Sequence, residues 1–382
     1  MEADDAFTDR QADLTLFPLV EWRRHLLAAA RRPPAPAAAD EGFLGSRPLR
    51  EQVVRYLGAA RGIACDASQV LIVSGIRQGL DLCGRVLLRP ADTVLLEDPG
   101  YVHAAPLFSA YARRVRPLPV DGEGCPVPHA QRHAGAKLLH LTPAHQSPTG
   151  VTLPVSRRLE LLAWARQHGA WLVEDDYDSE FNYRSAPLPA LKSLDSADRV
   201  IHCGCFNKTL FADLRIGYLV LPRALVQSFA AASRVVGRAV GLIEQRALAA
   251  FIASGGLARH VRRSRAIYAQ RRERTLAALR DALAPLPLHT TGEHGGFHFA
   301  WWLPPSLPLA PLLAEAAARG LQLRPVGDWC RRAAMPPGLV LADTALRDEA
   351  LDDALARLRA AIMAAKQSRG RGRSKPRPVS AD

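Results

Sequence analysis

Short apolar segments alternate with helix-like segments between residues 62 and 254, and this alternation constrains the fold more than any other feature of the chain. The apolar segments have the length of buried strands, whereas segments such as 155–168 have helical patterning. Strands separated by helices pair in parallel, because the helix returns the chain to the starting end of the sheet. We therefore expect an α/β fold with a mostly parallel sheet flanked by helices. The expected strands lie within 69–73, 93–96, 137–141, 170–178 and 199–202.

The whole chain is long enough for two domains. With 382 residues, of which 48% are hydrophobic and 23% charged, it can bury a large core. We predict an N-terminal arm with helices at 1–61, a large domain at 62–254, a smaller α+β domain with its connecting helix at 255–364, and a disordered basic tail at 365–382. The patterning predicts helices at 21–32, 48–61, 308–319 and 347–364, a long helical stretch at 242–283, and strands at 296–302 and 321–325.

Lys208 follows an expected strand and precedes Arg215 in the sequence. A lysine amine in a loop beneath a sheet can form a Schiff base, the internal aldimine, with an aldehyde cofactor. An arginine one or two helical turns further on can bind that cofactor's phosphate. The pair suggests pyridoxal phosphate, although a lysine taken alone is more often a solvated surface charge.

Segment 170–178 reads as a buried strand that ends in carboxylates, where open α/β sheets place their ligand chemistry. Asp175 is the candidate partner of the pyridine nitrogen, because a carboxylate there keeps the nitrogen protonated and the ring able to accept electrons. Tyr177 can donate a hydrogen bond to the ring's phenolic oxygen. A helix N-terminus or a solvated acidic turn is an equally good interpretation of these residues alone.

A small-residue turn joins the expected strand at 69–73 to a helical pattern. Such a turn, here at Ser74, exposes the backbone N–H groups of Gly75, Ile76 and Arg77 to an anion at the positive end of a helix. Most strand–glycine–helix junctions bind nothing, so this signal is weak by itself.

Two further loops offer possible cofactor contacts. Tyr101 follows the expected strand at 93–96 and could stack on a flat heterocycle, although a tyrosine in a turn more often only packs. The loop at 142–150 is rich in proline and glycine and could equally be an ordinary turn.

The order and spacing of these motifs resemble those of the fold-type I pyridoxal-phosphate aminotransferases of class I/II. Within them the chain is most similar to the aminotransferase-like domain of the MocR/GabR regulators. The resemblance runs from about residue 13 to about residue 364 and implies a homodimer that acts on amino acids and 2-oxo acids. It rests on Ser74-Gly75, Pro99-Gly-Tyr101, Pro148-Thr-Gly150, Glu174-Asp-Asp-Tyr177 and Phe206-Asn-Lys-Thr-Leu-Phe211 with Arg215, and on the flanking segments 13–18, 21–24, 49–62 and 295–298.

The resemblance also implies roles for individual residues. Lys208, Asp175 and Tyr177 would be catalytic. The cofactor would be bound by these three together with Ser74, Gly75, Ile76, Arg77, Tyr101, Ser147, Cys205 and Arg215.

This chain departs from the enzymes at four places. Ser147 stands where they usually carry an asparagine, Cys205 where they carry a hydroxyl, and Asn207 where serine is usual. A thiol donates a weaker hydrogen bond than a hydroxyl, which predicts lower phosphate affinity. The enzymes present an arginine to the substrate carboxylate near the C-terminus, but segment 338–343 has none, and none of Arg324, Arg331, Arg332 and Arg347 can be assigned to the task.

Two functions fit these residues. In the first, an aminotransferase, Lys208 forms the aldimine and moves a proton between the substrate Cα and the cofactor carbon. In the second, the same pocket only senses an amino acid or the cofactor and passes a conformational change to DNA or a partner. The regulators begin with a DNA-binding domain, for which the residues before Asp13 leave no room, and this favours the enzyme; Ser147 and segment 338–343 favour the sensor. A third possibility, a cofactor-free structural relative, is opposed by the presence of Lys208, Asp175 and Arg215.

The net charge of +13 does not by itself indicate nucleic-acid binding, because six positive charges fall within 366–377. A segment so poor in apolar residues cannot bury enough surface to fold. It is either a solvated end or a weak, sequence-independent contact for polyanions. We predict no specific nucleic-acid partner.

Metal binding and membrane insertion are not expected. Cys203 and Cys205 have no matching His/Cys pair at ligand spacing, so we predict no metal. No apolar stretch approaches the ~20 residues of a membrane span, and the acidic N-terminus does not resemble a signal peptide. We therefore expect a cytoplasmic protein.

Overall fold

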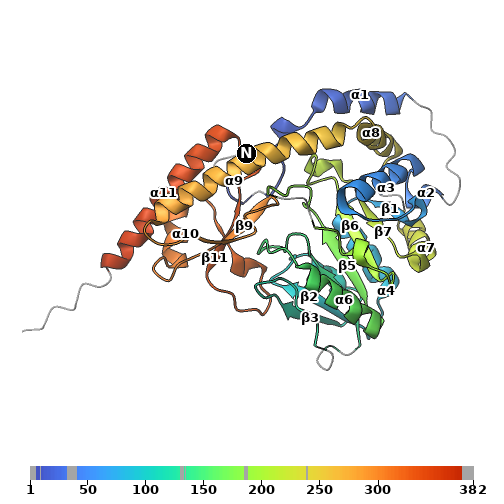
Figure 1. The fold of residues 1–382 in the computed structure, drawn as a ribbon, viewed down its shortest axis with the longest axis horizontal. Coiled ribbons are helices and arrows are strands. Elements are labelled where there is room, and N and C mark those ends of the chain that lie inside the picture. The colour runs from blue at the N-terminus through green and yellow to red at the C-terminus, as the bar shows by residue number, and fades with distance from the viewer. Residues whose placement is uncertain are drawn as a thin grey trace, which may run out of the picture.

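The computed structural model describes residues 6–8, 10–31, 41–129, 133, 135–184, 188–237 and 240–371. These residues form a larger body around a seven-stranded sheet and a smaller body around a four-stranded sheet. Helix α9 (Gly256–Leu283) extends from one body to the other (Figure 1). The predicted α/β architecture is confirmed, and the four-part division of the chain remains our interpretation.

The larger sheet is mostly parallel, as predicted. Its strand order is β1-β7-β6-β5-β4-β2-β3, and β7 alone in this sheet runs antiparallel to both of its neighbours. The central strands are buried on both faces along almost their whole length, which explains why their segments are rich in apolar residues. The strands are β1 (Val70–Val73), β2 (Thr93–Asp98), β3 (Arg114–Pro119), β4 (Ala136–Leu141), β5 (Trp171–Asp176), β6 (Val200–Cys205) and β7 (Gly217–Val220).

Helices cover both faces of this sheet. One face packs against α2 (Glu41–Leu44), α4 (Ile76–Leu87), α5 (Ala104–Ser109) and α7 (Val226–Val236). The other face packs against α6 (Val155–His168), α3 (Arg47–Arg61) and α8 (Leu242–Ala253), and α1 (Leu19–Ala30) lies on α8 (Figure 1). The helices predicted at 21–32, 48–61 and 155–168 are therefore present within about two residues of the expected ends.

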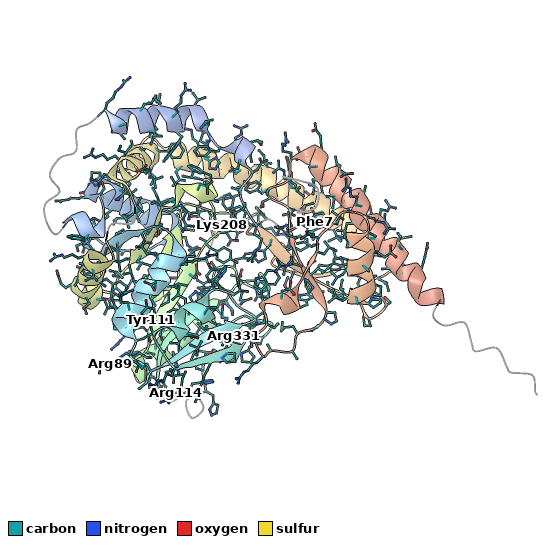
Figure 2. All side chains as sticks on the ribbon, turned by 180° about the vertical axis from the view of Figure 1, so that it is seen from behind. Phe7, Arg89, Tyr111, Arg114, Lys208 and Arg331 are labelled. Carbon is teal, nitrogen blue, oxygen red and sulfur yellow. The ribbon has the colours of Figure 1, made fainter. Side chains whose placement is uncertain are left out.

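The smaller sheet is antiparallel, with strand order β10-β11-β9-β8. Its strands are β8 (His289–Thr291), β9 (His298–Trp302), β10 (Arg324–Pro325) and β11 (Gly338–Ala342). Helices α10 (Leu309–Ala317) and α11 (Asp348–Arg371) and the C-terminal half of α9 enclose its core. Phe7 belongs to this core although it comes from the N-terminal segment, as Figure 2 shows.

Three local predictions need correction. The helical stretch 242–283 is two helices, because the chain turns at Gly255 with φ of +75°, a conformation that favours glycine. The strand expected at 321–325 is reduced to β10. Residues 365–371 continue α11, and the Lys366 amine donates to the carbonyls of Ala282 and Leu283 at 2.8 and 3.0 Å. The rest of the predicted basic tail, 372–382, lies outside the described residues.

The N-terminal arm packs against its own chain. Asp13 forms a buried ion pair with Arg271 of α9 at 2.8 Å. Phe17 packs edge-on against Trp22 and Phe211, with ring centroids 6.1 and 4.8 Å away. The arm therefore covers α9 and the larger body, whereas Leu14 stays 66% exposed.

Arg272 of α9 ties three elements of the smaller body together. Its guanidinium makes a bidentate ion pair with Asp343 at 2.8 and 2.9 Å and donates to carbonyls of the turn before β9, including that of Gly296. Arg272→Ala leaves the Asp343 carboxylate buried without its charge partner, so we expect a loss of about 3–5 kcal/mol in the free energy of unfolding. Urea denaturation followed by circular dichroism measures this loss.

The matched control is Arg274→Ala, two residues along the same helix. The Arg274 side chain is 36% exposed and pairs at the surface with Asp352. Its loss should cost under about 1 kcal/mol. If the two substitutions lowered the free energy of unfolding equally, the conclusion that the buried ion pair of Arg272 stabilises the protein more than the surface pair of Arg274 would be wrong.

Candidate active site

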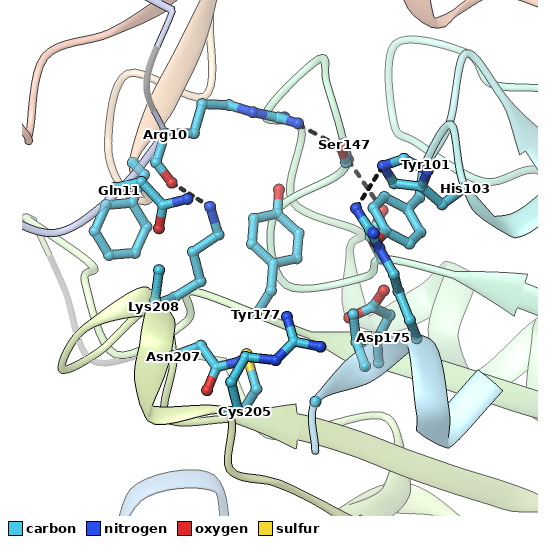
Figure 3. Close-up of a pocket in the computed structure, with 17 residues that line it drawn as sticks. Arg10, Gln11, Tyr101, His103, Ser147, Asp175, Tyr177, Cys205, Asn207 and Lys208 are labelled. Carbon is cyan, nitrogen blue, oxygen red and sulfur yellow. Dashed lines mark hydrogen bonds between the residues drawn. The ribbon is translucent and has the colours of Figure 1, made fainter. Parts of the chain in front are cut away.

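A cavity of about 340 Å³ lies at the carboxyl ends of β5 and β6 and extends to the N-terminal segment and the smaller body (Figure 3). Parallel sheets place their ligand sites at this end of the strands. All the residues predicted to bind a cofactor line this cavity except Ser74, whose N–H donates to the Gln78 side chain at 2.7 Å. Residues from at least five separate segments therefore converge on one site.

Lys208 lies in the loop after β6. This loop is fixed by a bond from the Phe206 N–H to the Ile216 carbonyl at 2.9 Å and by the Asn207 side-chain oxygen, which accepts from the Ile216 N–H at 2.9 Å. The Lys208 amine donates to the backbone carbonyl of Arg10 and lies 5.8 Å from the centre of the Phe297 ring. The amine thus points into the cavity (Figure 3).

Asp175 reaches the cavity because side chains alternate along β5. Its neighbours Glu174 and Asp176 have other partners, namely His202 at 3.0 Å and Arg61 at 2.8 Å. The buried Asp175 carboxylate lies 3.2 Å from Nε2 of His140, which fixes its orientation. One edge of this carboxylate group faces the open cavity, so it can bind a protonated ring nitrogen.

The end of the cavity near α4 is suited to an anion. Gly75 precedes α4 with φ of +124°, and a Cβ there would lie 3.1 Å from the Asn207 side-chain nitrogen, so a larger residue would crowd the turn. The first N–H groups of α4 and the guanidinium of Arg215 border the same space. Burial raises the pKa of the Cys205 thiol to about 12, so it is a neutral, weak donor here.

These features fit a phosphorylated pyridine. The turn at Gly75 and Arg215 suit a phosphate group, Asp175 suits the ring nitrogen, and the Lys208 amine suits an aldehyde carbon. Tyr101 lies beside this space, and its hydroxyl accepts from Arg77 at 3.4 Å.

Tyr177 belongs to a cluster that the sequence did not reveal. Its hydroxyl donates to the backbone carbonyl of His145 at 2.7 Å, and its ring stacks on His298 with an angle of 10° between the planes. His145 in turn lies 3.1 Å from Asp178. Burial, together with the charge of Asp178, raises the pKa of Tyr177 well above its usual value, so the phenol stays protonated.

The donor atoms of His145, Asp178 and His298 lie within 4.8 Å of one another, a spacing that could hold a metal ion. Their surroundings oppose a cation, however. Burial, followed by the positive charge of Arg10, lowers the pKa of His298 well below its usual value, and Lys208 adds to this effect. We interpret the cluster as packing and hydrogen bonding around Tyr177. The only sequence signal for it was the Gly295-Gly-Phe-His298 motif.

Arg10 also lines the cavity, and it was absent from the predicted site. The residue lies in the N-terminal segment, and its guanidinium reaches across to Ser147, whose hydroxyl accepts at 3.4 Å (Figure 3). No sequence pattern distinguished it from the many other arginines of the chain.

Comparisons with known proteins show the family to which the chain belongs. Residues 42–322 match the family model of the class I and II aminotransferases, so the chain belongs to that family, whose members depend on pyridoxal phosphate. The predicted resemblance is thereby confirmed.

Its sequence relatives include regulators. The chain is 33% identical over 364 residues to the probable rhizopine catabolism regulatory protein MocR of Rhizobium meliloti, covering 95% of this chain and 73% of that protein. It is 36% identical over 316 residues to the transcriptional regulator TauR of Rhodobacter capsulatus, covering 82% of this chain and 64% of that one.

Solved structures of enzymes share the fold. The kynurenine aminotransferase of Pyrococcus horikoshii aligns with a TM-score of 0.82 at 27% identity, covering 94% of this chain and 90% of that one. The α-aminoadipate aminotransferase LysN of Thermus thermophilus, solved with phosphopyridoxyl-leucine, aligns with a TM-score of 0.79 at 26% identity over 95% and 92% of the two chains.

Glu174 links strand β5, which carries Asp175, to strand β6 and to the segment at 191–192. Its buried carboxylate faces His202 and accepts the N–H groups of Leu191 and Lys192 at 2.7 and 2.9 Å. Burial alone would raise its pKa, but the charge and hydrogen bond of His202 and the charge of Arg61 outweigh burial and lower the pKa to about 2.

A carboxylate whose pKa is lowered by folding stabilises the protein above its unfolded-state pKa, and this contribution is lost as the pH falls toward the folded-state pKa. The contribution of Glu174 should therefore decline below about pH 4.5, by about 2 kcal/mol at pH 3. Urea denaturation at pH 6 and pH 3 measures the difference in the free energy of unfolding between wild type and Glu174→Gln. This difference should be smaller at pH 3 than at pH 6 by this amount. Glu160→Gln, an exposed carboxylate on α6, should show no such change, and a gap of constant size for Glu174→Gln would refute the assignment.

Proposed function

We propose that this protein binds pyridoxal phosphate and transfers an amino group between an amino acid and a 2-oxo acid. The observation that carries the proposal is the convergence of Lys208, Asp175, Arg215 and the α4 N-terminus on one cavity. Bound pyridoxal phosphate would supply an aldehyde for capture of an amine and a conjugated ring that accepts electrons.

The two ends of the site would have different tasks. Arg215 and the backbone N–H groups after Gly75 would bind the phosphate and fix the position of the ring. Asp175, oriented by His140, would hold a proton on the ring nitrogen. Tyr101 would cover one face of the ring. To hydrogen-bond the ring's oxygen substituent, Tyr177 would turn its hydroxyl away from the His145 carbonyl to which it donates in this structure.

Lys208 would act twice at its Nζ atom. It would hold the aldehyde covalently, and as a free amine it would move a proton to or from the substrate Cα. Phe297 lies beside the lysine and gives the cavity an apolar wall at that atom.

Lys208→Ala should abolish covalent attachment of the cofactor while the phosphate contacts still permit weaker binding. The measurement is borohydride reduction with pyridoxal phosphate, followed by peptide mass spectrometry of the labelled lysine. Lys137→Ala, on strand β4, is the control and should label as wild type does. A label on any lysine other than Lys208 in the wild type would overturn the assignment.

A sensor of amino acids without turnover is the second candidate. It is favoured by the regulators among the sequence relatives and by Ser147 and segment 338–343, which depart from the enzyme pattern. A panel of amino acids added to the cofactor-loaded protein separates the two. Conversion of the absorbance to that of pyridoxamine phosphate identifies transamination, and a shift without conversion identifies a sensor.

If the panel shows turnover, Asp175→Ala should lower it by orders of magnitude while borohydride still labels Lys208. The reason is that an unprotonated ring is a poor electron acceptor. Asp328→Ala removes an exposed carboxylate and should leave turnover unchanged. Near-normal turnover in Asp175→Ala would move the role to Asp176 or Asp178.

A homodimer and a cytoplasmic location remain part of this proposal. Exposed apolar side chains on α1 and α8, including Leu19, Val20, Leu27 and Ile243, support packing against a second copy. No described helix is both long enough and apolar enough to cross a membrane.

A further inference from the structure

Arg10 is a half-buried cation in the wall of the cavity. Its guanidinium lies 5.2 Å from the centre of the Trp329 ring and donates one long hydrogen bond, of 3.4 Å, to the Ser147 hydroxyl. Among the described residues, no carboxylate lies within ion-pair distance of it. The desolvation of this cation by burial lowers the pKa of Arg10 and is the largest influence on it.

The nearby carboxylates have other polar partners, although one oxygen of Asp178 is buried without a hydrogen bond. Asp178 accepts the Phe297 N–H at 3.1 Å and faces His145, and Asp175 is held by His140 on another wall. A desolvated guanidinium with five donors and one weak partner is the type of group to which a carboxylate binds well.

The backbone around Arg10 is fixed on both sides, so the guanidinium is positioned in advance. The Gln11 carbonyl accepts from the Thr344 hydroxyl at 2.9 Å, and the Asp13 N–H donates to the Tyr268 hydroxyl at 2.9 Å. The Arg10 carbonyl itself accepts from Lys208, which places this residue next to the reactive amine.

The cavity has two separate places that suit an anion, and Arg10 borders one of them. The turn at Gly75, with Cys205 and Asn207, borders the phosphate end, whereas Arg10 and Ser147 border the other side, with Tyr177 between them in Figure 3. A ligand that joins the aldehyde at Lys208 would therefore leave its carboxylate near Arg10.

Segment 338–343, which carries no arginine, packs on the same tryptophan. Val340 of β11 belongs to an apolar cluster with Ala300, Val326 and Trp329. The smaller body thus offers an aromatic surface at this wall, and the cation over that surface that lines the cavity is Arg10 of the N-terminal segment.

We propose that Arg10 binds the carboxylate of the amino-acid ligand and that it selects ligands bearing this group over simple amines. This inference rests on the proposed function, because it assumes that the ligand is an amine captured at Lys208. Arg10 is a binding residue in this scheme and takes no proton.

The test compares wild type with Arg10→Gln and Arg10→Lys. The ligands are the amino acid that gives the largest spectral change in the panel and the amine that lacks its carboxyl group, each titrated into the cofactor-loaded protein. Arg10→Gln should weaken binding of the amino acid by about 10- to 100-fold, the usual range for a charge-assisted hydrogen bond, and leave binding of the amine unchanged. Arg10→Lys should restore part of the loss, because it keeps the charge without the planar fork.

Arg324→Gln is the matched control. Arg324 also lies over the Trp329 ring, at 5.4 Å, but it is exposed and does not line the cavity. The Arg324→Gln variant should bind the amino acid with the affinity of wild type. Equal affinities of wild type and Arg10→Gln for the amino acid, or an equal loss in Arg324→Gln, would overturn the proposal.

A second measurement does not depend on the reaction. Calorimetric titration of propionate into the cofactor-loaded protein should show binding in wild type and in Arg324→Gln and none in Arg10→Gln, with melting temperatures reporting whether each variant is folded. Absence of propionate binding to wild type would count against the subsite. Failure of the proposed function would show separately, as a wild type that borohydride does not label at Lys208.

Discussion

The side-chain alternation of strand β5 is the constraint on which the site depends. Glu174 and Asp176 point to one face of the sheet and bind His202 and Arg61, whereas Asp175 points to the other and reaches the cavity. A shift of one residue in the pairing of β5 would exchange these faces. The buried partners of Glu174 and Asp176 therefore do more than stabilise the strand, because they fix which carboxylate the ligand meets.

Supporting contacts also fix the geometry of the loop after β6. Lys208 carries the reactive amine, but its direction is set by Asn207 and by the backbone bonds between residues 206 and 216. Asn207 was expected to be a departure from the enzyme pattern, and here it fastens the loop to the start of β7. The departure at Asn207 therefore has a structural role of its own in this chain.

The sequence was sufficient to predict the site residues that lie at or shortly after the end of an apolar strand. Lys208, Asp175, Gly75 and Tyr101 each come directly after an apolar segment, and parallel strands bring such positions to one edge. Strand β3 was not predicted because it is partly exposed at the sheet edge, and β8 was not predicted because it has only three residues. Strands β7 and β11 were also missed, although they are buried throughout and as long as the predicted strands β1 and β9.

The contacts that sequence reasoning missed join residues far apart in the chain. Arg10 and Ser147 are separated by 137 positions, and Asp178 and Phe297 by 119. No local periodicity encodes such pairs, because they arise only when the smaller body and the N-terminal segment close over the sheet. Single polar residues in irregular segments carry no pattern that would indicate their partners.

The N-terminal segment is attached to both bodies. The Phe7 carbonyl accepts from the Ala342 N–H of the smaller sheet at 2.9 Å, and Phe17 packs on Phe211 of the larger body. Arg10 lies between these two anchors, above the cavity. Any rotation of one body against the other must therefore be absorbed by the nine residues between the anchors, and it displaces Arg10 relative to Arg215. The span between the two cationic groups, and with it the length of ligand that can touch both, is set by the angle between the bodies.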